Sequence, residues 1–189
     1  QQSTLKVEGC WETSYVEHAY IEPEAGYAVR RDQRLELFVS TQTPYMDRDE
    51  VAQVLGIGPD QVRIIPSAVG GGFGGKLDCL VQPLLAVAAW ILEKPIRCTF
   101  TRPESLASST KRHPAKMKAS ATCDKDGSLT SLSFEGDFNT GAYASWGPTV
   151  ADRVPIHCSG PYFVPNILAK TRALLTNGPP SGAFRGFGV

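Results

Sequence analysis

The first third of the chain is dominated by runs of strand-forming residues. Residues 10–22 (CWETSYVEHAYIE) are rich in aromatic and β-branched side chains, and residues 27–41 contain two such runs on either side of the turn residues 31–33. Residues 61–69 (QVRIIPSAV) predict a further strand that leads into a glycine-rich run. Together these runs predict a sheet that includes at least one hairpin.

Two segments carry the apolar spacing of a helix. Residues 47–56 (DRDEVAQVLG) have an aspartate at their start, apolar residues on one side and a glycine at their end, which predicts a short helix. Residues 77–92 (LDCLVQPLLAVAAWIL) are apolar over most of their circumference and predict a buried helix. Pro83 is expected either to kink this helix or to mark its true beginning nearby.

The second half of the chain again favours strands. We expect strands at residues 96–101 and 166–176, and a pair within residues 115–138 that turns at residues 124–127 (DKDG). Residues 144–163 are interrupted by glycine and proline, and their structure stays open. Strands and helices mix without strict βαβ alternation, so the predicted class is α+β, with a mixed sheet and packed helices.

Charge and composition exclude several classes of function. The 189 residues include 19 Lys or Arg and 19 Asp or Glu, so the formal net charge is zero. There is no basic stripe typical of nucleic-acid binding, no polybasic arm for a membrane, and no apolar run long enough to span one. We therefore expect neither nucleic acid nor a membrane as a partner.

The five cysteines are scattered and form no C-x-x-C pair. Such spacing argues against a zinc or iron–sulfur site in this chain and against a disulfide scaffold, which favours the reducing cytoplasm. The chain starts without a signal-peptide pattern, and it stops inside a Gly/Phe-rich run. Both ends look cut, and residues 1–189 are expected to be one incomplete domain of a longer protein.

The run Ser67–Asp78 (SAVGGGFGGKLD) is the strongest candidate for a site. Gly70–Lys76 fits the phosphate-binding pattern G-x-x-x-x-G-K, but that loop needs a Ser or Thr next, and this chain has Leu77. The run also contains G-x-G-x-x-G, which is a weak signal without an acidic residue at the end of a second strand. A nucleotide-binding loop is thus an alternative that the residues only partly support.

A set of segments in fixed order points to a specific family. GGGFGGK occurs with STQ upstream, at residues 40–42, and with GAFRGFG at residues 182–188. VEHAYIEP (16–23), NTGAY (139–143) and GPYFVPN (160–166) accompany them. The combination resembles the molybdopterin-binding region of the molybdenum hydroxylases, the xanthine dehydrogenase and aldehyde oxidase family, and the likeness covers essentially the whole chain.

This resemblance implies a molybdenum–molybdopterin cofactor, with the cytosine dinucleotide form left open. The pterin dithiolene holds the metal, so no side chain of this chain is expected to ligate it. The reaction is the hydroxylation of an aldehyde or a purine-like N-heterocycle with oxygen from water. Electrons leave through [2Fe–2S] clusters to FAD on partner domains or subunits. The catalytic base, a glutamate, lies downstream of this chain in the family, so the chain alone is expected to be inactive.

The resemblance also implies roles for individual residues. Gln42 matches an amide that donates to an oxo ligand of the metal, and Gly72, Phe73 and Gly74 match backbone that lies against the cofactor. Arg185 belongs to the FRGF segment, whose backbone approaches the metal ligands.

Three further positions are expected to face the substrate. Phe187 matches an aromatic residue that packs on a flat substrate, and Arg153 lies 32 residues before Arg185, the spacing of a substrate-facing arginine in purine-oxidising relatives. Leu77 stands where those relatives usually have a glutamate, and it cannot hydrogen-bond a purine. The substrate class therefore stays open, and a non-catalytic relic of the fold remains an alternative.

Overall fold

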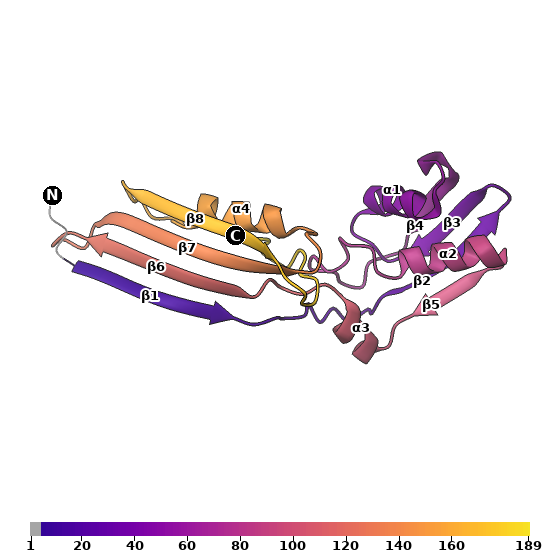
Figure 1. Cartoon of the computed structure of the whole chain (residues 1–189), viewed down its shortest axis with the longest axis horizontal. Helices are drawn as coiled ribbons and strands as arrows, with labels where there is room; N and C mark the ends of the chain where they lie inside the picture. Colours follow the sequence, from indigo (N-terminus) through magenta and orange to yellow (C-terminus); the bar gives the residue numbers. More distant parts are fainter. Residues whose placement is uncertain (1–4) are drawn as a thin grey trace. The chain divides into compact units, whose positions relative to one another are not determined.

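The computed structural model describes residues 5–189, and the chain divides into two compact units. The described part of unit 1 comprises residues 5–16 and 111–189, and unit 2 comprises residues 17–110. Unit 2 is therefore inserted between the first strand of unit 1 and the rest of that unit (Figure 1).

Unit 1 is built on a four-stranded sheet in the order β1-β6-β7-β8 (Figure 1). Its first three strands pair antiparallel, whereas β7 and β8 are parallel. A parallel pair needs a crossover connection, and the helix α4 supplies it. The elements of unit 1 are β1 (Leu5–Thr13), β6 (Ala115–Cys123), β7 (Leu129–Gly141), α4 (Gly147–His157) and β8 (Ile167–Leu175).

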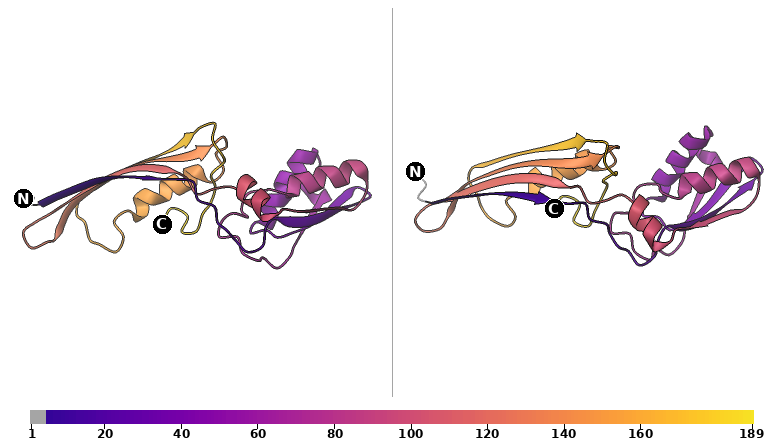
Figure 2. Two further views of the ribbon diagram at one scale, coloured as in Figure 1. Left: turned by 90° about the horizontal axis from the view of Figure 1, so that it is seen from below. Right: turned by 60° about the horizontal axis from the view of Figure 1, so that its bottom comes forward.

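Helix α4 lies along one face of this sheet (Figure 2). Ala151 of α4 packs with Ala115 and Phe138 of the sheet in a small core, to which Met117 and Val154 add partly buried side chains. The core of unit 1 is therefore confined to the end of the sheet that α4 covers.

Unit 2 has a second four-stranded sheet, in the order β4-β3-β2-β5. Here β3 and β4 are the parallel pair, and the helix α1 makes the crossover between them. The elements of unit 2 are β2 (Ala25–Arg31), β3 (Arg34–Val39), α1 (Pro44–Leu55), the 3₁₀ turn η1 (Pro59–Gln61), β4 (Val62–Pro66), α2 (Gln82–Leu92), β5 (Ile96–Thr99) and α3 (Arg102–Ser108).

Helices α1 and α2 pack on the sheet of unit 2 and enclose its main core (Figure 2). Leu35 and Leu37 of β3, Val51 of α1, and Leu85 and Ala89 of α2 are all fully or almost fully buried in it. Unit 2 thus has the larger apolar core of the two units, and β3 runs through its centre.

Most of the predicted elements are confirmed. The structure is α+β, although its strands form two mixed sheets rather than one. The turn at residues 31–33 joins β2 to β3, and the turn at residues 124–127 joins β6 to β7. Helix α1 ends at Gly56 in the left-handed conformation, as the glycine predicted, and Pro83 lies in the first turn of α2, which begins at Gln82.

Three expectations need correction, and one segment that the sequence left open is now defined. The strand predicted over residues 10–22 ends at Thr13, because the chain beyond it packs beneath the glycine run instead of pairing. Helix α1 begins at Pro44, so Asp47 lies inside it and is fully buried. Residues 77–81 are not helical, which shortens the predicted buried helix. Residues 144–163, left open by the sequence, contain α4, whose proline at position 155 lies inside the helix.

Helix α3 was not predicted. Its start carries a capping box, in which the Thr101 side chain accepts from the backbone N–H of Glu104 and Glu104 accepts from Thr101. Among residues 5–189, no helix is both long enough and apolar enough to cross a membrane.

Candidate functional site

In unit 2, the glycine loop (residues 67–78) and Gln42 follow neighbouring parallel strands. Gln42 comes three residues after the end of β3, and the loop leaves the end of β4. The carboxyl ends of parallel strands meet at one edge of a sheet, where open α/β sheets commonly bind ligands. The topology therefore brings two predicted parts of the site together.

The carboxamide of Gln42 is fixed by the loop. Its Oε1 accepts the backbone N–H of Gly74 at 3.1 Å and that of Lys76 at 3.3 Å. The backbone N–H of Gln42 also donates to the Lys76 carbonyl at 3.0 Å. Two donors on Oε1 select one orientation of the amide, so the Nε2 group is on the other side and donates to no residue that the structure describes.

The glycines of the loop are needed for close packing. A Cβ on Gly72 would lie 2.4 Å from Oε1 of Gln42, and one on Gly75 would lie 2.7 Å from the ring of Tyr20 and 2.9 Å from Nδ1 of His18. A Cβ on Gly70 would lie 2.5 Å from the Cβ of Glu22. From the motif we expected the glycines to approach a ligand. In the structure, the absence of side chains at these glycines also lets the loop pack against residues 18–22.

The tip of the loop is strained and partly open to solvent. Phe73 has φ +52°, which is uncommon for a residue with a side chain, and half of the residue is exposed. Gly71 and Gly74 on either side have φ of +102° and +101°. The backbone N–H groups of Gly71 and Gly72 donate to no described residue. Such strain at an exposed loop is typical of functional sites.

Lys76 closes the loop and points inward. Its Nζ donates to Oε2 of Glu22 at 2.7 Å and to Oγ of Ser40 at 3.0 Å, and it lies 4.9 Å from the ring centroid of Tyr20. The lysine side chain is only 2% exposed. A phosphate-binding lysine projects toward its ligand instead, so this geometry speaks against the phosphate-loop alternative.

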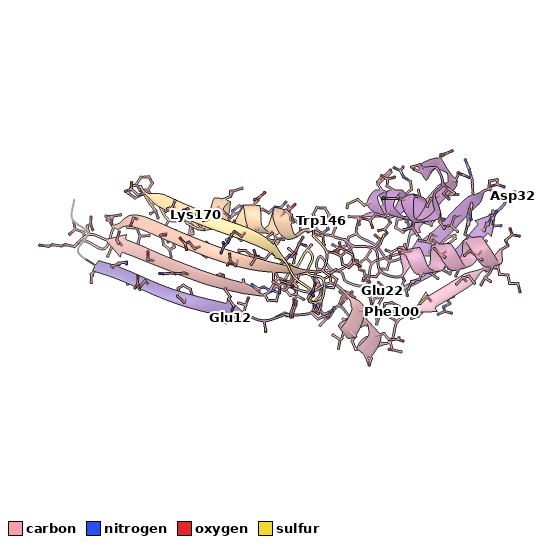
Figure 3. The ribbon with its side chains drawn as sticks, viewed as in Figure 1. Glu12, Glu22, Asp32, Phe100, Trp146 and Lys170 are labelled. Atoms are coloured by element: carbon pink, nitrogen blue, oxygen red, sulfur yellow. The ribbon has the colours of Figure 1, made fainter. Side chains whose placement is uncertain are left out.

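Glu22 lies among the loops of unit 2 (Figure 3) and links several of them. Its Oε2 accepts from Ser40 at 2.6 Å, from the backbone N–H of Gly70 at 2.8 Å and from Lys76. Burial pushes the pKa of Glu22 upward, but the hydrogen bonds from Lys76, Ser40 and Gly70 outweigh it and hold the pKa below its usual range. The carboxylate is therefore charged at neutral pH.

A second polar cluster fastens α1 to the segment after the loop. Asp47 is fully buried, and its two oxygens accept from Sγ of Cys79 at 3.3 Å and from Nε2 of Gln82 at 3.1 Å. Burial raises the pKa of Asp47, against hydrogen bonds from Thr41, Gln82 and Cys79. The cluster thus holds the end of the glycine loop against the helix that follows Gln42.

In unit 1, the C-terminal loop (residues 182–189) carries the second Gly-Phe-Gly sequence. Phe187 has φ +54° and lies between Gly186 and Gly188, each with φ +86°. The ring of Trp146, labelled in Figure 3, meets the Phe187 ring edge-on at 5.6 Å. The guanidinium of Arg153 lies 4.4 Å from the centroid of the same ring. Phe187 is thus held by an aromatic neighbour and a cation.

Arg185 is exposed, and its guanidinium lies 5.4 Å from the centroid of the Phe184 ring, with that of Arg112 at 5.7 Å from the same centroid. A cavity of about 280 Å³ opens beside this loop and includes Arg112, Arg185 and Phe187 in its lining. His113 also lines it, and burial lowers the pKa of this histidine to about 4. The imidazole is therefore neutral at pH 7.

The predicted site residues fall into two groups. Gln42, the Gly72–Gly74 segment and Leu77 come together in unit 2, where the Leu77 carbonyl accepts from the Thr43 hydroxyl at 3.1 Å. Arg153 and Phe187 come together in unit 1, and Arg185 lies two residues before Phe187. Sequence reasoning assigned no role to Glu22, Ser40, Lys76 or Trp146. The first three lie inside the ordered segments at residues 16–23, 40–42 and 70–76, which was the available signal, whereas Trp146 lies outside every quoted segment.

Comparisons with known proteins show the family to which the chain belongs. The family model described as "Molybdopterin cofactor-binding domain" matches residues 1–189. The nicotinate dehydrogenase large molybdopterin subunit of Eubacterium barkeri is 44% identical over 190 residues, and one subunit of a probable xanthine dehydrogenase of Bacillus subtilis is 37% identical over 189 residues. Both alignments cover 100% of this chain, but they cover only 45% and 25% of those proteins.

A solved aldehyde oxidoreductase from Desulfovibrio gigas superimposes on 98% of this chain with a TM-score of 0.94 and 26% sequence identity, and the match covers 21% of that protein. The chain therefore corresponds to a part of each of these longer proteins. With the family model matching along its whole length, the chain belongs to the molybdopterin cofactor-binding domain family, and its relatives are molybdenum hydroxylases of the xanthine dehydrogenase and aldehyde oxidase type.

Proposed function

We propose that this chain forms one wall of the molybdenum–molybdopterin site of an enzyme that hydroxylates an aldehyde or an N-heterocycle. The observation that carries the proposal is the orientation of Gln42. Its Oε1 is occupied by the N–H groups of Gly74 and Lys76, so its Nε2 is left to donate outward from the edge of the sheet.

The residues present fit such a cofactor. Residues 5–189 contain no group of three or more His, Cys, Asp or Glu that could hold a metal ion, which suits a metal held by the dithiolene of its own pterin. The donors around the tip are neutral: the Gln42 amide and the N–H groups of Gly71 and Gly72. Neutral donors suit ligands whose charge changes during a redox cycle. When bound, the cofactor would supply the redox-active metal that takes up the electrons, while the inserted oxygen comes from water.

Each residue of the tip then has a physical task. Gln42 donates to an oxo group, the N–H groups of Gly71 and Gly72 form a small nest for anionic atoms, and the half-exposed Phe73 excludes water from one side. The backbone of Gly72–Gly74 would lie against the cofactor.

We propose that the substrate is a flat N-heterocycle. Its binding would not need a hydrogen bond from residue 77, which is a leucine here. Leu77 offers only an apolar side chain, while Phe187 and Arg153 offer an aromatic face and a positive charge that stabilises charge developing on a ring. The name of the 44% identical relative, a nicotinate dehydrogenase subunit, supports a small heteroaromatic acid as the first substrate to test.

The remaining parts of the reaction are assigned to other segments. We propose that a glutamate outside this chain removes the proton, so the chain alone is inactive, and that [2Fe–2S] clusters and FAD on partner domains carry the electrons. Residues 1–189 would be the first part of the molybdopterin-binding region in a cytoplasmic enzyme. The cofactor is molybdenum–molybdopterin, with the cytosine dinucleotide form left open.

Two substitutions at Gln42 test the proposal. Gln42→Glu keeps an oxygen that accepts from the loop but removes the NH₂ donor, whereas Gln42→Met removes both. We expect Gln42→Glu to retain the fold while kcat falls by about 100-fold, the typical cost of one lost donor at a reacting centre. Gln42→Met should lose as much activity and also retain less molybdenum per polypeptide. Wild-type kcat and molybdenum content in both variants would contradict the role of Gln42.

The substrate proposal has its own measurement. Steady-state assays of the holoenzyme should give a higher kcat/KM with nicotinate than with xanthine, and Arg153→Ala should reduce that preference. A preference for xanthine, or for a simple aldehyde, would contradict this choice of substrate without touching the cofactor site.

A further inference from the structure

Lys76 is part of the glycine motif, yet the proposed cofactor contacts do not use it. Its ammonium group is buried among Glu22, Ser40 and the ring of Tyr20, on the inner side of the loop. A buried ammonium is costly unless it is paired and hydrogen-bonded. Its contacts therefore need an explanation other than ligand binding.

Glu22 supplies the pairing charge and ties both ends of the glycine run to one atom. Its Oε2 accepts from the backbone N–H of Gly70, the first residue of the glycine run, and from the ammonium of Lys76, its last residue. The backbone of Glu22 adds a further bond, because its N–H donates to the Gly70 carbonyl at 3.1 Å. Ser40, one residue beyond β3, donates to the same Oε2 and so connects this junction to the sheet.

The tip of the loop lies between two hydrogen-bonded residues, Gly70 and Gly74. Gly71, Gly72 and Phe73 lie between Gly70 and the Gln42-bound N–H of Gly74, and two of the three have positive φ. Lys76 also offers its backbone N–H to Gln42. If Lys76 moves, the tip of the loop and the carboxamide of Gln42 therefore move with it.

We propose that Glu22, Lys76 and Ser40 are positioning residues, which hold the tip of the glycine loop and Gln42 in the geometry that faces the cofactor. They act through the loop backbone and touch neither cofactor nor substrate. This inference rests on the proposed function for its catalytic consequence, but its structural part can be measured without any cofactor.

The test compares four variants of the holoenzyme. Glu22→Gln keeps the shape and one acceptor oxygen but removes the charge, Lys76→Met removes the ammonium, and the double variant removes both. Lys94→Met is the matched control, because Lys94 is an exposed lysine of unit 2 between α2 and β5. Hydrogen exchange followed by mass spectrometry reports on the loop, and steady-state kinetics report on catalysis.

We expect Lys76→Met to speed hydrogen exchange about tenfold in peptides that cover residues 67–78, while β2, β3 and β5 exchange as in the wild type. A misplacement of about 1 Å is expected to reduce kcat by about 100-fold, with KM changed much less. Glu22→Gln should do the same to a smaller extent, and Lys94→Met should change neither measurement. The double variant should be no worse than Lys76→Met, because the two residues act as one unit.

The outcomes separate the two proposals. Unchanged exchange over residues 67–78 in Lys76→Met, or fully additive losses in the double variant, would overturn the positioning role whatever the enzyme binds. If Lys76→Met unfolds unit 2, the milder Glu22→Gln and a Ser40→Ala variant decide by the same exchange measurement. A holoenzyme that lacks molybdenum would instead refute the proposed function and leave the loop measurement valid.

Discussion

The two Gly-Phe-Gly loops of the molecule arise from the same local topology but are held by different forces. In unit 2 the order β3-α1-β4 leads to Phe73, and in unit 1 the order β7-α4-β8 leads to Phe187. Each crossover joins a parallel pair, and each phenylalanine has a left-handed backbone conformation. Two strained aromatic corners thus follow two parallel strands, although the strands belong to separate sheets.

The difference lies in what fixes each corner. The glycine loop is held by directional polar contacts, through the carboxylate of Glu22 and the carboxamide of Gln42. In the C-terminal loop the Phe187 side chain is held by contacts with Trp146 and Arg153, and Gly188 packs closely on α4. Hydrogen bonds there join backbone to backbone, as from the Phe187 N–H to the Phe184 carbonyl. Hydrogen bonds define the position of backbone N–H groups, whereas ring contacts define a surface. The glycine loop is therefore suited to orient donors, and the C-terminal loop is suited to present an aromatic wall.

The largest expected effect is that of Gly188→Ala in the C-terminal loop. Its φ of +86° disfavours any side chain, and the new Cβ would lie 2.6 Å from the Val150 carbonyl of α4, which is backbone and cannot swing away. We expect a loss of more than about 3 kcal/mol of unfolding free energy. Gly127→Ala is the matched control, since φ is +82° but nothing lies within 4 Å, and it should cost only about 1–2 kcal/mol. Equal losses in denaturant titrations of the two variants would refute the packing argument.

The second expected effect concerns stability as a function of pH, because units 1 and 2 should lose stability over different pH ranges. His113 of unit 1 has a folded pKa of about 4, against about 6.5 when unfolded. The unfolded state therefore binds the proton more readily, and unit 1 should lose about 3 kcal/mol as the pH falls from about 6.5 to 4. In unit 2 the pKa of Glu22 is lowered, so its contribution is present above the ordinary pKa of a glutamate and is lost only as the pH falls through the lowered value.

Hydrogen exchange measured between pH 7 and pH 4, with rates corrected for intrinsic chemistry, distinguishes these two windows. Peptides around β6 and α4 should lose protection first, and His113→Leu should remove that loss. If the glycine loop loses protection before β6 and α4 as the pH falls, the assignment of the higher pH range to His113 and of the lower range to Glu22 is wrong.

The smallest effect on stability is expected for Gly72→Ala in the glycine loop. The new Cβ would meet the side chain of Gln42, whose far end can move, so we expect a cost of about 1 kcal/mol or less. Function should suffer more, because the displaced carboxamide no longer presents its donor, and kcat should fall by about 100-fold. A Gly72→Ala enzyme with wild-type kcat would show that the position of Gln42 is not critical.

Much of the fold follows from local signals along the chain. Gly56 marked a helix end because glycine readily adopts the left-handed conformation. Pro83 indicated either a kink or a helix start, and the structure shows the start, since proline is tolerated in the first turn. Helix α3 was not predicted, although Thr101 and Glu104, with a proline between them, have the spacing of a capping box. Helix α4 was not readable, because Pro155 and the flanking glycines are typical of irregular chain.

The site was predictable only where local motifs mark its residues, and contacts between distant residues were not. Gln42 and the Gly72–Gly74 segment could be recognised from ordered motifs, but the Glu22–Lys76 pair joins residues 54 positions apart and leaves no periodic signal. The phosphate-loop alternative would require Lys76 to face a ligand, whereas burial against Ser40 and Tyr20 turns it inward. Long-range pairing of buried charges depends on the tertiary fold, which single-sequence patterns do not encode.

A crystal structure of the holoenzyme, with anomalous diffraction collected at the molybdenum edge, would decide whether Gln42 faces the metal. We expect Nε2 of Gln42 to lie within about 3.2 Å of a non-carbon ligand atom of the metal, while Oε1 keeps its bonds to Gly74 and Lys76. A molybdenum peak beyond the reach of Gln42, with the glycine-loop tip facing away from it, would refute the placement of this loop at the cofactor.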